Sequence, residues 1–199
     1  MKILLIGASG TIGSAIKKEL IQRHEIISIG RTSGDLHVDI SDSASIRQLF
    51  EQTGKFDALV CAAGNVKFAP LAELTEEDFA VGLQDKLMGQ VNLVRIGSEY
   101  ASDGASFTLT TGVLSHDPIR FGASASLVNG AIDSFVKAAA IELPRGLRIN
   151  SVSPTVLVEA MDEYAPYFRG FKPVAAVDVA LAYAKSVEGL QTGQTYRVG

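Results

Sequence analysis

The chain alternates short apolar runs with longer segments in which apolar residues recur every three or four positions. The first pattern is typical of a buried strand and the second of an amphipathic helix. The apolar runs predict strands at residues 3–6, 25–29, 36–38, 57–61, 105–109, 148–152 and 195–198. The helical pattern predicts helices at residues 12–20, 43–50, 75–100, 122–143 and 173–187. Residues 156–172 fit neither pattern and are expected to form an irregular segment.

Strands and helices therefore alternate through all 199 residues, and no linker or repeat divides them. Such alternation predicts an α/β fold: one doubly wound parallel sheet with helices on both faces, in a single domain over residues 1–199. Ligands of such sheets bind beyond the carboxyl ends of the strands. The residues that directly follow the predicted strands are therefore the candidate site.

A glycine turn follows the first strand and opens the first helix, with the spacing G-x-x-G-x-x-G from Gly7 to Gly13. Glycines at this point let the backbone turn tightly and approach a diphosphate, and the helix that follows directs unpaired N–H groups at the anion. A turn that binds nothing is the alternative. Strand, glycine turn and helix in this order favour a dinucleotide-binding loop of the Rossmann type. Its candidate contacts are Gly7, Ser9, Gly10, Thr11, Ile12 and Gly13.

The end of the second strand bears on which dinucleotide is bound. An acidic residue there hydrogen-bonds a ribose 2′-hydroxyl, whereas an arginine accommodates a 2′-phosphate. The chain has Arg31, Thr32 and Ser33 at this point, and no carboxylate before Asp35. This arrangement favours NADP over NAD, although Arg31 as an ordinary exposed loop residue is the alternative.

Small or polar residues follow the other strands. Asp39 and Ile40 come after the third strand, where Asp39 either meets the adenine amino group or caps the next helix. Small residues after the fourth strand suggest a close approach to the cofactor ribose. The remaining candidate contacts are Ala62, Ala63, Gly64, Thr110, Pro154, Thr155 and Val156. Cys61, at the end of the fourth strand, is expected to be a small buried residue rather than a reactive thiol.

Composition narrows the class of protein. Apolar residues make up 47% and charged residues 20%, as in a folded soluble chain. A net charge of −4 without a basic cluster argues against nucleic acid as a partner. The single cysteine excludes an intrachain disulfide and a cysteine-based metal cluster, and the histidines lack metal-ligand spacing, so no metal is expected. Without a signal peptide or an apolar run long enough for a membrane, a cytoplasmic location is expected.

In this order the motifs resemble those of the short-chain dehydrogenases/reductases. The resemblance rests on the glycine turn, on Val38-Asp39-Ile40, and on Cys61-Ala62-Ala63-Gly64 in place of the family's Asn-Asn-Ala-Gly. It rests also on the run from Arg148 to Pro154 and on Thr192-Gly193 near the C-terminus. The resemblance implies NADP-dependent oxidation or reduction of a small alcohol or carbonyl compound.

The family's catalytic positions are changed in this chain. The family uses asparagine, serine, and a tyrosine and lysine spaced Tyr-x-x-x-Lys. Here Ala125 stands in place of the tyrosine and Asn129 in place of the lysine. Thr111 lies in the region of the family's serine, and Lys86 aligns with the asparagine. Lysine and asparagine have thus exchanged places, and we expect Lys86, either solvated or turned toward the nicotinamide ribose, to decide whether the site keeps its charge.

The missing phenol leaves the proton donor open. His116, Tyr164 and Tyr167 lie near the predicted substrate region, but a lone residue of these types is more often structural. Three functions follow: an oxidoreductase with a non-standard site, a catalytically silent NADP(H)-binding regulatory protein, or an isomerase or dehydratase on this scaffold. The family's habit of pairing through its two long helices implies a homo-oligomer here through residues 75–100 and 123–143.

Overall fold

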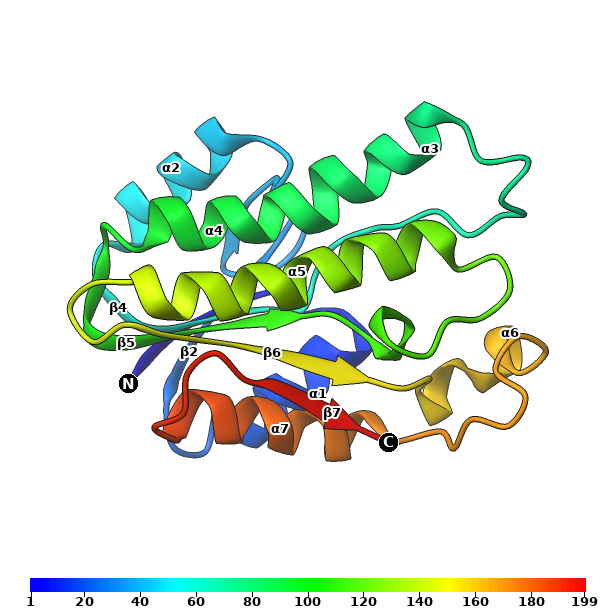
Figure 1. Ribbon diagram of the computed structural model, residues 1–199. Coiled ribbons are helices and arrows are strands. Elements are labelled where there is room, and N and C mark those ends of the chain that lie inside the picture. Colours follow the sequence, from blue (N-terminus) through cyan, green and yellow to red (C-terminus); the bar gives the residue numbers. More distant parts are fainter.

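Seven parallel strands form one sheet in the computed structural model, which describes residues 1–199 (Figure 1). The strands lie in the order β3-β2-β1-β4-β5-β6-β7, and every neighbouring pair is parallel. Their bounds are β1 Lys2–Ile6, β2 Glu25–Gly30, β3 Leu36–His37, β4 Phe56–Cys61, β5 Ala101–Thr110, β6 Arg148–Pro154 and β7 Thr195–Val198. The doubly wound parallel α/β fold predicted from the sequence is confirmed.

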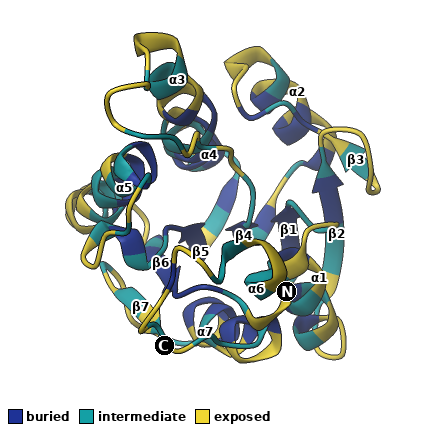
Figure 2. Cartoon of the chain, turned by 90° about the vertical axis from the view of Figure 1, so that its right-hand side faces the viewer, coloured by how far each residue is buried: buried dark blue, intermediate teal, exposed yellow.

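Helices cover both faces of this sheet. Five are regular α-helices of two turns or more: α1 Thr11–Leu20, α2 Ser43–Thr53, α4 Gly89–Gly97, α5 Ala123–Glu142 and α7 Ala176–Glu188. Shorter ones are α3 Glu76–Val81, the π-helix η1 Gly82–Met88, the 3₁₀ turns η2 Val113–Ser115 and η3 Val158–Ala160, and α6 Met161–Tyr164. Helices α2, α4 and α5 pack on one face, and α1 and α7 pack on the other (Figures 1 and 2).

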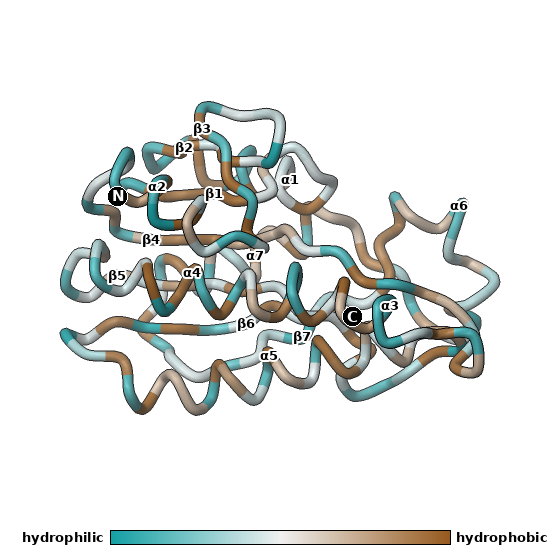
Figure 3. Tube along the Cα trace, turned by 90° about the horizontal axis from the view of Figure 1, so that it is seen from above, coloured by the Kyte–Doolittle hydropathy of each residue, from teal (hydrophilic) through white to brown (hydrophobic).

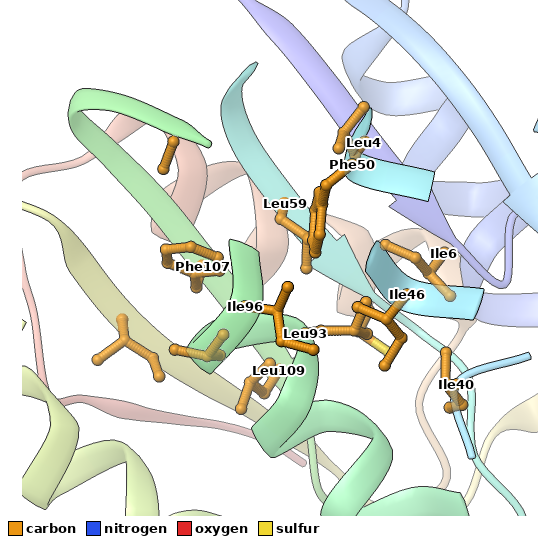
Figure 4. Packing of buried hydrophobic residues seen from close by; sticks show 14 of the residues in the cluster. Leu4, Ile6, Ile40, Ile46, Phe50, Leu59, Leu93, Ile96, Phe107 and Leu109 are labelled. Atoms are coloured by element: carbon orange, nitrogen blue, oxygen red, sulfur yellow. The ribbon is translucent and has the colours of Figure 1, made fainter. Parts of the chain in front are cut away.

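Alternation along the central strands divides the core between these two layers. On β1, Leu4 and Ile6 belong to the cluster under α2, α4 and α5, whereas Ile3 and Leu5 belong to the cluster under α1 and α7. Successive side chains of a strand point to opposite faces, so a strand buried on both sides must be apolar throughout. Figure 3 shows this as mostly brown along β1 and β4, although Lys2 and Asp57 in these strands are polar. Figure 4 shows the first cluster, with Phe50 beside Leu59 and Phe107 nearby.

The long helix predicted over residues 75–100 is interrupted in the middle. It begins with a capping box, in which the Thr75 hydroxyl accepts from the Asp78 N–H and the Asp78 carboxylate accepts from the Thr75 N–H. It then widens into the π-helix η1 before it continues as α4. Stretches of π-helix commonly occur at functional sites. This one carries two charged side chains, Asp85 and Lys86, toward the carboxyl edge of the sheet.

Two elements begin well away from the residue that the sequence predicted, and the other boundaries differ less or only at an element's end. Strand β5 begins at Ala101 rather than at residue 105, because Ala101 pairs with Phe56 across a bulge that polar residues conceal in the sequence. Helix α7 begins at Ala176 rather than at Pro173. Val174 instead forms a parallel bridge with Leu157, and the Glu159 carboxylate accepts from the Ala176 N–H at the first turn.

Candidate functional site

The segments that follow β1, β2, β4, β5 and β6 gather at the carboxyl edge of the sheet, which Figure 2 shows face on. Strand β1 lies between β2 and β4, so the chain reverses its direction of travel across the sheet at β1. Ligands of doubly wound sheets bind beside such a reversal. The glycine turn directly follows β1 and therefore lies at the expected position.

The glycine turn is so closely packed that side chains do not fit. Gly7 has a φ of +84°, and a Cβ atom on it would lie 2.6 Å from the Ala62 carbonyl oxygen. A Cβ atom on Gly13 would lie 2.0 Å from the Gly7 oxygen. Gly10 caps α1 without any side-chain hydrogen bond, so the first N–H groups of the helix have no protein side chain as partner. The turn is thus an open anion cradle at a helix N-terminus.

A cavity of about 170 Å³ extends from this cradle toward β2 and β3. Its lining residues are Ile6, Gly7, Ser9, Gly30, Arg31, Val38, Ile40, Ala63, Gly64, Asn65 and Asp85. Arg31 is exposed and lies 3.0 Å from the Asp39 carboxylate and 3.6 Å from that of Asp85. The Asn65 amide donates to Asp85 at 2.7 Å. Sequence reasoning missed Asn65, in the loop after β4, and Asp85, because a polar residue on a helix gives no signal until the π-helix turns it inward, and Asn65 is explained only by that contact.

Asp39 and its neighbours settle one of the alternatives left open by the sequence. The Asp39 carboxylate accepts from Ser41 and from Arg31, and these contacts, that with Ser41 first, lower its pKa. The N-cap of α2 is Asp42, whose side chain accepts from the Ala44 N–H. Asp39 is therefore not the helix cap. Thr32 and Ser33 are exposed, and the Ser33 hydroxyl lies 3.3 Å from that of Ser9.

A second cavity, of about 250 Å³, lies on the other side of the glycine turn and is called here the reaction pocket. Its polar or titratable lining residues are Lys86, Thr111, Asn129, Thr155 and Tyr164. The rest of the lining is Ile12, Val66, Phe68, Gly112, Val113, Leu114, Ala125, Pro154, Val156, Leu157, Ala160 and Phe168. The structure thus brings together the three candidate catalytic residues, from η1, the end of β5 and α5.

Lys86 points into the reaction pocket and is not a solvated helix lysine. Its side-chain stem lies against Gly64, where a Cβ atom would be 2.6 Å from the Lys86 Cγ. Its ammonium is 3.5 Å from the Thr111 carbonyl oxygen and has no carboxylate within 4.0 Å. Burial lowers the pKa of Lys86 to about 8, against smaller opposing effects of Cys61 and Asp133.

Asn129 and Thr111 complete the polar part of the pocket. The Asn129 side chain is buried and its Oδ1 has no hydrogen-bond partner. The amide group fits only because Gly112 lacks a side chain, since a Cβ atom there would lie 3.1 Å from Nδ2. Thr111 is held by its own N–H, which donates to the Val152 carbonyl at 2.9 Å. An unpartnered buried amide in a cavity is the kind of group that a ligand satisfies.

Thr110 takes a different position from the one expected of a cofactor contact. Its hydroxyl is buried in the core, where it lies 2.5 Å from both the Tyr183 hydroxyl and the Cys61 carbonyl oxygen. Gln90, which sequence reasoning missed, donates to the Thr110 carbonyl at 3.0 Å and accepts from its N–H at 2.8 Å. Cys61 is fully buried and its pKa is raised to about 12 by burial, as a structural thiol requires.

The other possible proton donors are less well placed. His116 is exposed and contacts Ser115 rather than the reaction pocket. Tyr164 lines the pocket, and burial and the nearby Glu163 raise its pKa. Tyr167 lines a neighbouring cavity of about 230 Å³, called here the aromatic cavity. That cavity is formed by Phe68, Ile119, Arg120, Phe121, Glu163, Tyr164 and Tyr167.

Comparison with known proteins decides the family. Residues 12–188 match the sequence profile of the family described as Enoyl-(Acyl carrier protein) reductase. The chain belongs to the short-chain dehydrogenase/reductase family. Its relatives include L-xylulose reductase from Bos taurus, 26% identical, with 82% of this chain and 75% of the relative covered. Carbonyl reductase [NADPH] 2 from Sus scrofa is 28% identical, with 81% and 73% covered.

Solved structures of the family share the fold over the whole chain. The protein lin1944 from Listeria innocua is 55% identical, with a TM-score of 0.99 and full coverage of both chains. A small-chain dehydrogenase in complex with NADPH is 26% identical, with a TM-score of 0.88, covering 100% of this chain and 96% of its own. No helix of this chain combines the length and the apolar character needed to cross a membrane.

Proposed function

We propose that this protein is an NADP(H)-dependent oxidoreductase acting on a small carbonyl or alcohol compound through a non-standard active site. The observation that carries the proposal is the position of one ammonium group. Lys86 and the unpartnered Asn129 amide line one apolar cavity. This cavity lies directly beside the glycine cradle at the N-terminus of α1. A nucleotide seated on that cradle has its reactive end beside these two groups.

Arg31 supports NADP rather than NAD. Its guanidinium is exposed beside the cradle. The chain has this arginine, and no acidic residue, at the position where a carboxylate would hold a ribose 2′-hydroxyl. A 2′-phosphate would pair with the Arg31 guanidinium in place of the Asp39 and Asp85 carboxylates. One relative named for NADPH and one structural neighbour solved in complex with NADPH support this assignment.

The candidate contacts divide along the cofactor as follows. Backbone N–H groups at Ser9, Thr11, Ile12 and Gly13 would hold the diphosphate, with Gly7 and Gly10 forming the turn, since the Gly10 N–H donates to the Gly7 carbonyl. Arg31, Thr32 and Ser33 would surround the 2′-phosphate. Apolar Ile40 and the residues near Asp39 would flank the adenine, with Ala62, Ala63 and Gly64 beside the ribose. Pro154, Thr155 and Val156 line the reaction pocket at the nicotinamide end. When bound, NADPH supplies a hydride, and Thr111, Lys86 and Asn129 surround the oxygen of the substrate.

Ala125 favours a second candidate, a catalytically silent NADP(H)-binding protein. Its methyl group is buried with Leu114, Val156 and Phe168 and offers no proton. Loss of a positioned general acid lowers a rate by roughly 10²–10⁴-fold. If no other group replaced it, the cradle would hold nucleotide without turnover.

Binding and turnover measurements separate the two candidates. We expect NADPH to bind more tightly than NADH by fluorescence titration, and Arg31→Ala to remove most of that preference. A screen of carbonyl compounds then follows NADPH oxidation with the wild type and with Lys86→Ala. Tight binding with no turnover favours the silent protein, whereas turnover lost in Lys86→Ala supports the enzyme. If neither nucleotide binds, both candidates fail.

A homo-oligomer through the helices at residues 75–100 and 123–143 is also part of the proposal. Helix α5 exposes Leu127 and Ile141, at 48% and 87% of their surface. The π-helix η1 exposes Leu83 and Met88. Light scattering after size exclusion would show more than one subunit, and Leu127→Asp would shift the protein toward monomer. A monomeric wild type contradicts this part of the proposal alone.

A further inference from the structure

We infer that the Lys86 ammonium is the proton donor to the substrate oxygen, in the role of the family's tyrosine, which Ala125 replaces in this chain. This inference deepens the proposed oxidoreductase function and rests on it. Under this inference Lys86 does more than keep a positive charge beside the ribose, because the proton that is transferred to the substrate comes from its Nζ.

The position of Nζ supports a donor rather than a structural group. Its one hydrogen-bond acceptor in the protein is the Thr111 carbonyl, at 3.5 Å, which is a long and weak contact. No carboxylate lies within 4.0 Å. The ammonium has three N–H groups, so at least two remain free toward the cavity. A cation with a structural role would instead be paired, as Arg23 is with Glu19 and Glu188.

The stem of Lys86 holds this position firmly. Its Cβ and Cγ atoms pack over Gly64, where a Cβ atom would approach to 2.8 and 2.6 Å. Gly64 has a φ of +131°, a conformation that favours glycine, so the chain is shaped to admit the lysine stem at this point. The π-helix η1 turns the side chain inward, whereas Asp85 next to it turns toward Arg31.

The other lining groups of the reaction pocket do not serve as the acid. Tyr164 is the only other titratable residue among them, and its pKa is raised, which weakens it as a donor near neutral pH. Thr111 and Thr155 carry unactivated hydroxyls, and the Asn129 amide does not ionise. Burial brings the pKa of Lys86 down to about 8, close to physiological pH, where a general acid is most effective.

The charged and titratable neighbours of Lys86 come from three elements. Cys61 from β4 and Asp133 from α5 both raise its pKa, but less than burial lowers it. Asp85 precedes it on η1 and is engaged by Asn65. Asp133 accepts from the Ser151 hydroxyl at 2.8 Å and from that of Thr195 at 3.2 Å, so it does not pair with the ammonium.

In carbonyl reduction, a hydride from NADPH adds to the carbonyl carbon of the substrate, and the C=O π bond breaks toward oxygen. The oxygen takes a proton from Lys86 Nζ, which leaves an alcohol, NADP⁺ and a neutral amine. Solvent then returns a proton to the amine. In the oxidation direction the neutral amine accepts the alcohol proton, so the two directions have opposite pH dependence.

Two substitutions separate a proton donor from a fixed charge. Lys86→Met keeps the length of the stem and removes the ammonium. Lys86→Arg keeps a positive charge that does not ionise in the accessible pH range. Lys137→Met is the matched control, because Lys137 is exposed on α5. The nucleotide affinity of each variant is measured first, to establish that the cradle is intact.

We expect the kcat for carbonyl reduction to fall by about 10²–10⁴-fold in both Lys86 variants, with the Kd for NADPH unchanged. Wild-type kcat should fall as pH rises through about 8, because the donor loses its proton, and both variants should lack this alkaline fall. Lys137→Met should behave as the wild type.

A readout independent of turnover uses acetylation by a limiting amount of acetic anhydride, with each lysine followed by mass spectrometry. Lys86 should reach half of its maximal reactivity near pH 8. If Lys86→Arg retains wild-type kcat, or if the reactivity of Lys86 shows no half-point near pH 8, the inference is overturned while NADPH binding stands. If the wild type binds NADPH but reduces no carbonyl, the proposed oxidoreductase function fails, and the inference fails with it.

Discussion

Burial of Lys86 has a consequence for stability that needs no substrate to detect. The ordinary pKa of a lysine side chain is 10.5, and in the folded protein that of Lys86 is lowered to about 8. At about 1.4 kcal/mol for each pH unit, the buried ammonium opposes folding by up to about 3–4 kcal/mol. Lys86 retains some contact with solvent, so we take about 1–2 kcal/mol as the expected cost. Lys86→Met removes this cost and should stabilise the protein at pH 7.

The stability difference between Lys86→Met and the wild type should depend on pH. Below about pH 8 the folded and unfolded chains both carry the proton, and the cost is present in full. Between about pH 8 and 10.5 the unfolded chain binds more protons than the folded one, so the stability of the wild type rises relative to that of the variant. The advantage of Lys86→Met should therefore be about 1–2 kcal/mol at pH 7 and close to zero at pH 10.5.

Urea unfolding at a series of pH values measures both quantities, with Lys137→Met as the exposed control that should differ little from the wild type at any pH. The reasoning is refuted if Lys86→Met is less stable than the wild type at pH 7. It is equally refuted if the difference between the two proteins is the same at pH 7 and pH 10.5. Together with the loss of kcat described above, a gain in stability would show that the ammonium is kept for function at the expense of folding.

Three further predictions concern the cradle, the core beneath it and the substrate region. Gly13→Ala places a Cβ atom where only 2.0 Å separates it from the Gly7 oxygen, so NADPH binding should be lost in a titration and stability should fall by at least about 1–3 kcal/mol. Thr110→Val deprives the buried Tyr183 hydroxyl of its partner and should cost about 1–3 kcal/mol in urea unfolding without changing the Kd for NADPH. Tyr167→Ala removes one wall of the aromatic cavity and should raise the KM for aromatic carbonyl compounds several-fold while the Kd for NADPH is unchanged.

Each of these predictions has a control within the chain. Gly130 lies in the middle of α5 with open space where its Cβ atom would be, so Gly130→Ala should stabilise the protein by about 0.5–1 kcal/mol and leave nucleotide binding intact. Equal damage from both glycine substitutions would contradict the close packing described for the cradle. A weaker NADPH affinity in Thr110→Val would return Thr110 to the cofactor site. An equal rise in KM for open-chain substrates with Tyr167→Ala would contradict the prediction that the aromatic cavity contacts aromatic substrates.

Much of the architecture follows from local patterns. The apolar runs of β1 and β4 predicted central strands because both faces of those strands are covered, and this leaves an uninterrupted signal. The Thr75–Asp78 capping box was readable because all its contacts lie within one turn. The start of β5 at Ala101 was not readable, since its pairing with Phe56 crosses a bulge and depends on a distant strand.

The site divides in the same way. The glycine turn and its place after a first strand were evident from spacing alone, because its glycines lie close together in the sequence, whereas only the fold places Ala62 against Gly7. The engagement of Thr110 with Tyr183 and Cys61 was not, since the two faces of a strand end are equivalent in sequence and only the packed core fixes which one the hydroxyl meets. Asp85 and Asn65 were missed because their contact joins the π-helix η1 to the loop after β4, which are separate in sequence.

By itself, the sequence determined the order of strands and helices, the anion cradle at the first turn, and the exchange of residue types at positions 86, 125 and 129. Only the tertiary structure decided that Lys86 and Asn129, far apart in the chain, line one cavity. The physical reason is that both contacts are non-local: the π-helix η1 sets the direction of Lys86, and packing over Gly64 and Gly112 makes room for the two side chains. Removal of that ammonium from water, which lowers its pKa, is likewise a property of the packed fold and of no residue alone.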